Sequence, residues 1–115
     1  MTAFPDSDSS RAVRAGGLVF ATASATSAGT VADETGKCLD QLEKTLGQLG
    51  CGLGDLVKVN CYLADDGYRG EFWQTWDARF ASLDVRLVRI TQVVGIPGEH
   101  RVHLDATAVG PEGAE

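Results

Sequence analysis

The sequence has no long hydrophobic run. A helix needs about 18 or more consecutive apolar residues to span a bilayer, and no such stretch occurs. Residues 1–10 are polar and acidic, and they lack the basic start and the apolar stretch of a secretory signal peptide. We therefore expect a cytoplasmic protein without a membrane partner, in which residues 1–10 form a flexible leader and residues 111–115 a short tail.

Cysteine is also scarce. Only Cys38, Cys51 and Cys61 occur, and no two of them have C-x-x-C spacing. An odd number of cysteines disfavours a disulfide framework, and the absence of paired spacing disfavours a zinc site. We expect three reduced thiols that pack as small buried hydrophobic side chains, and we expect no metal or other cofactor.

Basic residues are fewer than acidic ones. The chain has 10 lysines and arginines against 16 aspartates and glutamates, which gives a formal net charge of −6. Affinity for nucleic acid depends mainly on neutralising phosphate charges, so this balance opposes it unless a local basic patch exists. The nearest approach to a patch is Arg86 with Arg89, which is too sparse to form a groove. Nucleic acid is therefore not an expected partner.

The remaining composition is typical of one small folded domain. Hydrophobic residues make up 43% of the 115 residues, and this length is that of a single domain. A domain of this size has a modest core, so other subunits are expected to cover part of its apolar surface. We assign residues 11–110 to the domain and expect a homo-oligomer.

Two kinds of periodicity predict the secondary structure. Alternating apolar residues predict strands, and apolar residues three and four positions apart predict amphipathic helices. In chain order, the predicted elements are strands at residues 12–15 and 18–22, a helix at 31–49, a strand at 56–63, a helix at 68–80, and strands at 86–94 and 102–108. This β-β-α-β-α-β-β order predicts an α+β fold, in which a single mixed sheet carries both helices on one face.

Local signals support these boundaries. Gly16-Gly17 is a hairpin turn between the first two strands, because type I′ turns need positive φ at their central positions. Thr30 with Asp33 resembles a capping box, and Gly50 is suited to a left-handed helix end.

Side-chain spacing predicts which residues share a face. In the strand at 56–63, one face is expected to carry Val57, Val59, Cys61 and Leu63. In the helix at 68–80, aromatic residues recur every four positions, which is more typical of core packing than of a ligand platform. These aromatic residues are Tyr68, Phe72, Trp76 and Phe80, with Trp73 beside them.

Four segments have motif-like sequences in a fixed order. They are Ala15–Phe20 in the hairpin, Asp55–Val59 at a strand entry, Ile96-Pro97 in a turn, and Val102–Val109 as the closing strand. In their order and spacing they resemble the Rid family, also called the YjgF family, over roughly residues 9–109.

This resemblance implies a chorismate-mutase-like homotrimer with clefts between neighbouring subunits. It also implies hydrolysis of reactive 2-imino or enamine acids to 2-keto acids and ammonia, without a cofactor. In the family an arginine binds the substrate carboxylate, while a backbone carbonyl and a glutamate position a water. A bidentate guanidinium–carboxylate pair and one oriented water suit this chemistry, because the C=N group is already electrophilic.

The family's site residues transfer unevenly onto this sequence. Its glutamate aligns with His103, our predicted catalytic residue, because an imidazole can hold a water or move a proton near neutral pH. The alternative is that His103 is a polar residue on a solvated strand face. The family's glycine after the hairpin aligns with Ala23 and its helical asparagine with Trp73, so both are predicted to contact substrate.

Two arginines compete for the carboxylate-binding role. The family register places this role on Val88, which cannot perform it. Arg86 lies on the same strand face as Val88, whereas Arg89 faces the opposite side unless a bulge intervenes. The segment Arg89–Val93 also resembles the family motif, so Arg86 and Arg89 are both predicted substrate-binding residues.

These residues favour a deaminase with a divergent site in an inter-subunit cleft. The alternative is a non-catalytic trimer that binds small carboxylates, because the arginine is kept while the glutamate is not. A nuclease is disfavoured by the charge and by the lack of a metal-binding carboxylate cluster. The expected partners are therefore a small carboxylic acid of the 2-imino or 2-keto type and two further copies of the chain.

Overall fold

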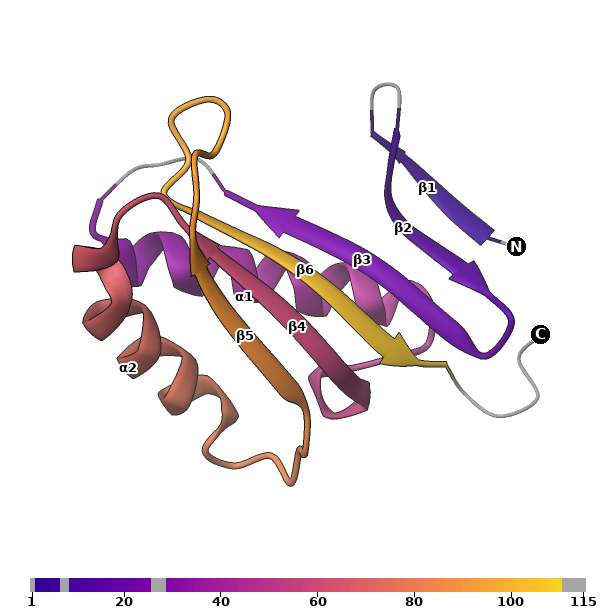
Figure 1. The fold of residues 1–115 in the computed structure, drawn as a ribbon. Helices are drawn as coiled ribbons and strands as arrows, with labels where there is room; N and C mark the ends of the chain where they lie inside the picture. Colours follow the sequence, from indigo (N-terminus) through magenta and orange to yellow (C-terminus); the bar gives the residue numbers. More distant parts are fainter. Residues whose placement is uncertain (1, 7–8, 26–28, 111–115) are drawn as a thin grey trace.

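The computed structural model describes residues 2–6, 9–25 and 29–110 and has an α+β fold (Figure 1). Its strands and helices are β1 (Thr2–Asp6), β2 (Ser9–Ala15), β3 (Leu18–Ser24), α1 (Val31–Gly47), β4 (Leu56–Leu63), α2 (Arg69–Phe80), β5 (Val88–Val93) and β6 (Val102–Val109). The strands form one sheet in the order β1-β2-β3-β6-β4-β5. Both helices lie on the same face of this sheet, so the predicted fold class is confirmed.

The sheet is mixed, as predicted. Strands β4 and β5 run parallel, because α2 forms the crossover between them, and every other pairing is antiparallel. The hairpin between β2 and β3 turns at Gly16, whose φ of 61° is easily adopted by glycine.

The amino-terminal segment differs from the predicted flexible leader. Residues 2–6 form β1, which pairs with β2, and β2 itself begins at Ser9. The sheet therefore has one more strand than predicted. The alternating hydrophobic signal was absent here because β1 is an edge strand. Its Pro5 lies at an irregularity in the register, where a sheet tolerates proline. The predicted tail at 111–115 lies outside the described residues.

The two faces of the sheet have different roles. The face beneath the helices forms the core, and its fully or nearly fully buried residues include Val19, Ala21, Ala23, Val59, Cys61, Leu63, Val102, Leu104, Ala106 and Ala108. The opposite face, which we call the open face, carries exposed apolar side chains, among them Leu18, Phe20, Val88, Ile90 and Val109. A hydrogen bond of 3.3 Å from the Asn60 amide to the Asp105 carboxylate lies between these apolar residues.

The prediction for the faces of β4 was wrong at one residue. Val57 is exposed, whereas Leu56 and Val59 are buried. The reason is a register shift between Leu56 and Lys58 against β6, which interrupts the alternation at Val57. From Val59 onward the predicted alternation is confirmed, with Lys58, Asn60 and Tyr62 on the open side.

Helix α1 packs its apolar stripe onto the sheet. Four of its apolar side chains have no exposed surface, which are Cys38, Leu39, Leu42 and Leu46. The predicted capping box is confirmed, because the Thr30 hydroxyl accepts from the backbone N–H of Asp33 and the Asp33 carboxylate accepts from that of Thr30. The helix ends at Gly47, and Gly50 adopts the predicted left-handed conformation, with φ of 79°.

A buried ion pair joins the start of α1 to the start of β6. The carboxylate of Glu34 is fully buried and accepts from the backbone N–H groups of Arg101 and Val102 at 2.8 and 3.0 Å. It also accepts from Arg101 Nε at 2.8 Å, while Arg101 Nη2 donates to the Gly29 carbonyl at 2.9 Å. Because these bonds span 67 residues of sequence or more, they fix where α1 begins relative to the sheet.

The three cysteines are buried, and none of them forms a disulfide. Burial raises the pKa of Cys38 and of Cys61 to about 12. These thiols are therefore packing residues, as predicted. Neither helix in the described part of the chain is long and apolar enough to cross a membrane.

Candidate functional site: an arginine–aromatic pocket between α2 and β5

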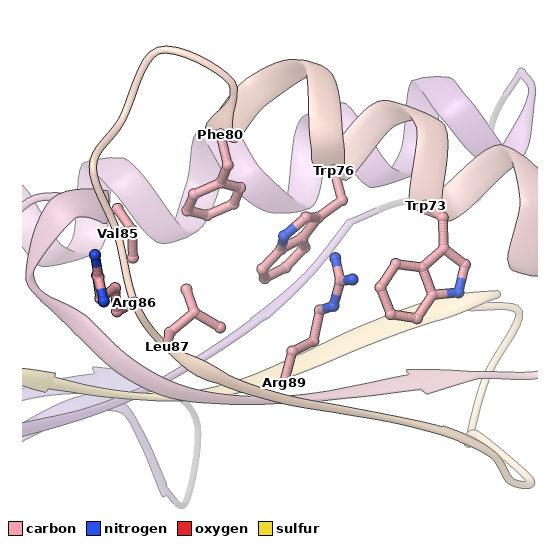
Figure 2. Close-up of a pocket in the computed structure, with 7 residues that line it drawn as sticks. All are labelled: Trp73, Trp76, Phe80, Val85, Arg86, Leu87 and Arg89. Carbon is pink, nitrogen blue, oxygen red and sulfur yellow. The ribbon is translucent and has the colours of Figure 1, made fainter.

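A pocket of about 460 Å³ lies between α2 and the segment that leads into β5 (Figure 2). We call it the α2–β5 pocket. Its lining consists of Trp73, Trp76, Phe80, Val85, Arg86, Leu87 and Arg89. Three of the predicted substrate-binding residues, Trp73, Arg86 and Arg89, are thus brought to one pocket.

Two rows of side chains form this pocket. On α2, Trp73, Trp76 and Phe80 are separated by three and four residues, so they share one helix face. On the facing segment, Val85, Leu87 and Arg89 alternate along the chain, while Arg86 lies at the end of the pocket and Val88 lies on the open face. The pocket follows from helical spacing on one side and extended spacing on the other.

Strand β5 begins later than predicted, and this decides which arginine can act. It begins at Val88, where pairing with Lys58 of β4 starts, so Arg86 lies in the preceding segment. Within β5, Arg89 faces the helices, and Val88 lies on the open face with 57% of its surface exposed. The register position occupied by Val88 therefore carries no carboxylate-binding group, as the sequence indicated.

Arg89 is held by aromatic stacking. Its guanidinium carbon lies 3.2 Å from the centre of a Trp73 ring and 5.4 Å from one of Trp76 (Figure 2). Such cation–π contacts restrain the plane of the guanidinium group. Burial lowers the pKa of Arg89, while nearby Asp77 opposes this effect. Arginine nevertheless stays charged at physiological pH, so the pocket contains a fixed cation.

The donors of Arg89 remain available to a ligand. Stacking uses the face of the guanidinium group and leaves its N–H bonds, which lie in the plane, free to donate. The nearest carboxylate oxygen, in Asp77, lies 3.6 Å from Nη1, which is too long for a hydrogen bond. The N–H groups of this guanidinium can therefore donate two parallel hydrogen bonds to a carboxylate that approaches in the plane of the group.

Arg86 occupies the other end of the pocket. It lies beside Val85, away from Arg89, and its side chain is exposed (Figure 2). No hydrogen bond or ion pair of Arg86 occurs within the described residues, so this guanidinium is not held in one orientation. The two arginines thus differ: Arg89 is stacked on Trp73, whereas Arg86 makes no such contact with the part of the chain that the structure describes.

His103 lies on the opposite face of the sheet from Arg89. It points to the open side from β6, half-buried, with its ring centre 6.1 Å from that of Tyr62. A second pocket, of about 200 Å³, adjoins it and includes Tyr62, Val94, Ile96 and Pro97. Burial lowers the pKa of His103; Asp105 opposes this shift and His100 adds to it. The imidazole is therefore mainly neutral at pH 7.

Ala23 is the predicted contact residue that the structure places least favourably. It is 2% exposed and faces the helices from β3, so its side chain belongs to the core. Within one chain, neither Ala23 nor His103 joins the α2–β5 pocket. His103 and Arg89 therefore line different pockets of a single subunit.

Four pocket residues were not predicted from the sequence, namely Trp76, Phe80, Val85 and Leu87. The first two were assigned to the core, and Trp76 is indeed 4% exposed, but Phe80 and Leu87 are only partly buried. The available signal was the match between aromatic spacing on α2 and the alternation of Val85, Leu87 and Arg89.

The fold defines this protein as a small α+β domain with a mixed sheet and two helices on one face. The family model described as Endoribonuclease L-PSP matches residues 5–109. This chain belongs to that family, which is the YjgF or Rid family that the sequence resembles. No curated protein sequence matches the chain.

Solved structures agree with this assignment. A YjgF-family protein from Neisseria meningitidis is 25% identical, with a TM-score of 0.82, covering 97% of this chain and 96% of its own. A YjgF-family protein from Mycobacterium tuberculosis is 29% identical, with a TM-score of 0.77 and coverages of 87% and 85%. TdcF of Escherichia coli, solved with bound serine, is 17% identical, with a TM-score of 0.82 and coverages of 93% and 91%.

Proposed function

We propose that this chain binds small carboxylic acids of the 2-imino and 2-keto type in the α2–β5 pocket. The observation that carries this proposal is the guanidinium of Arg89, stacked on Trp73 with its N–H donors unused by any hydrogen bond to Asp77. Because stacking already orients the Arg89 guanidinium, this group loses little conformational entropy when it binds a carboxylate. The serine bound to TdcF, which also carries a carboxylate, supports this ligand class.

Titration calorimetry with pyruvate and phenylpyruvate tests this function. Both are stable 2-keto acids, and binding of either one supports the proposal. If neither acid binds, the carboxylate site does not exist and the proposed function is wrong.

Hydrolytic deamination is the second candidate function, and it rests on His103. Water adds to the C2 carbon of a 2-imino acid, the nitrogen takes up the protons, and ammonia leaves to give the 2-keto acid. A half-buried and mainly neutral imidazole is suited to accept a proton from that water. Because the sheet separates His103 from Arg89, this reaction requires that the open face of one subunit adjoin the α2–β5 pocket of a neighbour.

Removing the imidazole is expected to separate turnover from binding. In the His103→Ala variant, ammonia release from 2-iminopropanoate, generated in situ, should fall by about 100-fold or more, with unchanged affinity for 2-keto acids. The wild-type rate should decline only below the ordinary histidine pKa, because burial lowers the pKa of His103. His100→Ala, which changes the other histidine, should keep the rate at pH 7, whereas its profile should shift to slightly higher pH because His100 adds to the lowering of the His103 pKa.

Two results would separate the candidate functions. If wild-type protein releases no ammonia above the uncatalysed rate but still binds 2-keto acids, the function is binding alone. If His103→Ala is as active as wild type, the imidazole takes no part in the reaction.

We also propose that the chain forms a homotrimer through its open face. Exposed apolar residues gather there, including Phe20 and Val88, which are 44% and 57% exposed. A patch of this kind on a small domain is typical of a protein–protein interface. Deamination requires in addition that this face of one subunit adjoin the α2–β5 pocket of its neighbour.

Light scattering at micromolar concentration is expected to return the mass of three chains. Phe20→Asp should dissociate the assembly, because it places a charge in the proposed interface. Leu83→Asp is the matched control, since Leu83 is 37% exposed and lies outside the sheet, and it should leave the mass unchanged. A monomeric wild-type protein, or a trimeric Phe20→Asp variant, would contradict the proposal.

A further inference from the structure

The α2–β5 pocket extends well beyond the guanidinium of Arg89. Arg89 lies between Trp73 and Trp76, and the pocket continues along α2 to Phe80 (Figure 2). Phe80 follows Trp73 by seven positions, which corresponds to about 10 Å along the helix. A three-carbon keto acid bound to Arg89 therefore leaves the far part of the pocket to water.

The far part of the pocket is apolar. Phe80, Val85 and Leu87 line it, and all three are only partly buried. The rings of Trp76 and Phe80 stack with their centres 4.5 Å apart, which gives a continuous aromatic wall. Covering such a surface with an apolar group is favourable, and an aromatic ring can also pack against the edges of these rings.

Arg86 offers a possible second charge at this end, but the geometry does not favour its use. Its side chain is exposed and has no hydrogen bond or ion pair within the described residues. Ordering such a side chain around a second carboxylate costs conformational entropy, unlike the pre-oriented Arg89. An apolar side chain therefore fits the pocket better than a dicarboxylate.

We propose that the α2–β5 pocket selects 2-keto and 2-imino acids with a bulky apolar side chain, above all an aromatic one, over acids with a small side chain. The carboxylate binds Arg89, and the side chain lies along Leu87 and Phe80. This inference rests on the proposed carboxylate binding, and it adds the determinant of specificity.

Calorimetry with three stable keto acids tests the inference on the wild-type protein. Phenylpyruvate is expected to bind about 10- to 100-fold more tightly than pyruvate, the ratio expected for burying one aromatic ring. It should also bind more tightly than 2-oxoglutarate, which carries a second carboxylate.

A pair of leucine variants tests whether the far part of the pocket causes the preference for phenylpyruvate over pyruvate. Leu87→Ala removes apolar surface inside the pocket and should weaken phenylpyruvate binding about fivefold, with a change of less than about twofold for pyruvate. Leu83→Ala is the matched control, because Leu83 lies outside the pocket, and it should change neither affinity. Thermal unfolding of both variants identifies any general loss of stability.

The possible outcomes are distinct. Pyruvate binding as tightly as phenylpyruvate would overturn the inference and leave the proposed function intact. Tighter binding of 2-oxoglutarate would overturn it in favour of a dicarboxylate site that uses both arginines. If none of the three acids binds, the proposed function itself fails.

Discussion

The Arg89→Ala variant is expected to lose 2-keto acid binding. In a partly desolvated site, deleting the partner of a ligand carboxylate should cost about 2 to 5 kcal/mol, because the ligand charge is left unpaired. The Arg89 side chain is only 25% exposed, so solvent screens this interaction less than at the surface. Calorimetry with phenylpyruvate measures the loss directly.

Arg86→Ala is the matched control for this prediction. The Arg86 side chain is exposed and not held, so its removal should change the affinity by less than about 1 kcal/mol. A large loss at Arg86 with none at Arg89 would reverse the roles of the two arginines. If both variants bind like the parent, the carboxylate site lies elsewhere and the deaminase candidate falls with it.

Two milder changes test the geometry around Arg89. Arg89→Lys keeps the charge but loses both the planar fork and the stacking on Trp73, so its affinity should lie between those of the parent and Arg89→Ala.

Asp77→Asn removes a competing carboxylate 3.6 Å from the guanidinium and should strengthen ligand binding, by at most about 1 kcal/mol because the Asp77 side chain is 71% exposed. Weaker binding in Asp77→Asn would mean that Asp77 orients Arg89 for the ligand.

The sequence predicted the elements of the fold well, because each has a strong local signal. The alternation in β6 and the capping box at Thr30 and Asp33 are examples. The departures arise where the deciding interactions are tertiary. The shift at Val57 depends on pairing with β6, and β1 depends on pairing with β2, so neither appears in a local pattern.

The candidate site was predicted only in part, for a related reason. The family register pointed to Val88. Arg86 was favoured because it lies two residues before Val88 and would share its face in a strand. Arg86 precedes the strand, however, so this alternation of faces does not apply to it. The pairing of β5 with β4 determines the position of Arg89, because it directs this side chain towards Trp73. Aromatic spacing could not reveal the pocket, because a helix face that packs on the core and one that borders a cavity have the same period.

The Glu34→Gln variant is expected to lose much of the stability of the fold. Within the described residues, the wild-type carboxylate accepts two hydrogen bonds from backbone N–H groups at the start of β6 and one from the Arg101 side chain, and none of its surface is exposed. Glutamine has one acceptor oxygen in place of two, so its NH2 group must face either Arg101 Nε or the two backbone N–H groups, and the Arg101 guanidinium loses its carboxylate partner. Breaking a buried pair in this way should cost about 3 to 5 kcal/mol of unfolding free energy.

Urea unfolding at a fixed protein concentration measures this loss, and the fixed concentration matters if subunits dissociate on unfolding. Glu43→Gln is the matched control on the same helix, because its side chain is 58% exposed and lies 3.8 Å from Arg79. The control should lose less than about 1 kcal/mol, as is usual for surface pairs. If the Glu34→Gln variant does not fold while the Glu43→Gln variant does, the loss of stability is larger than predicted and has the predicted cause. Equal stability of the two variants would mean that the α1–β6 ion pair does not hold the helix to the sheet.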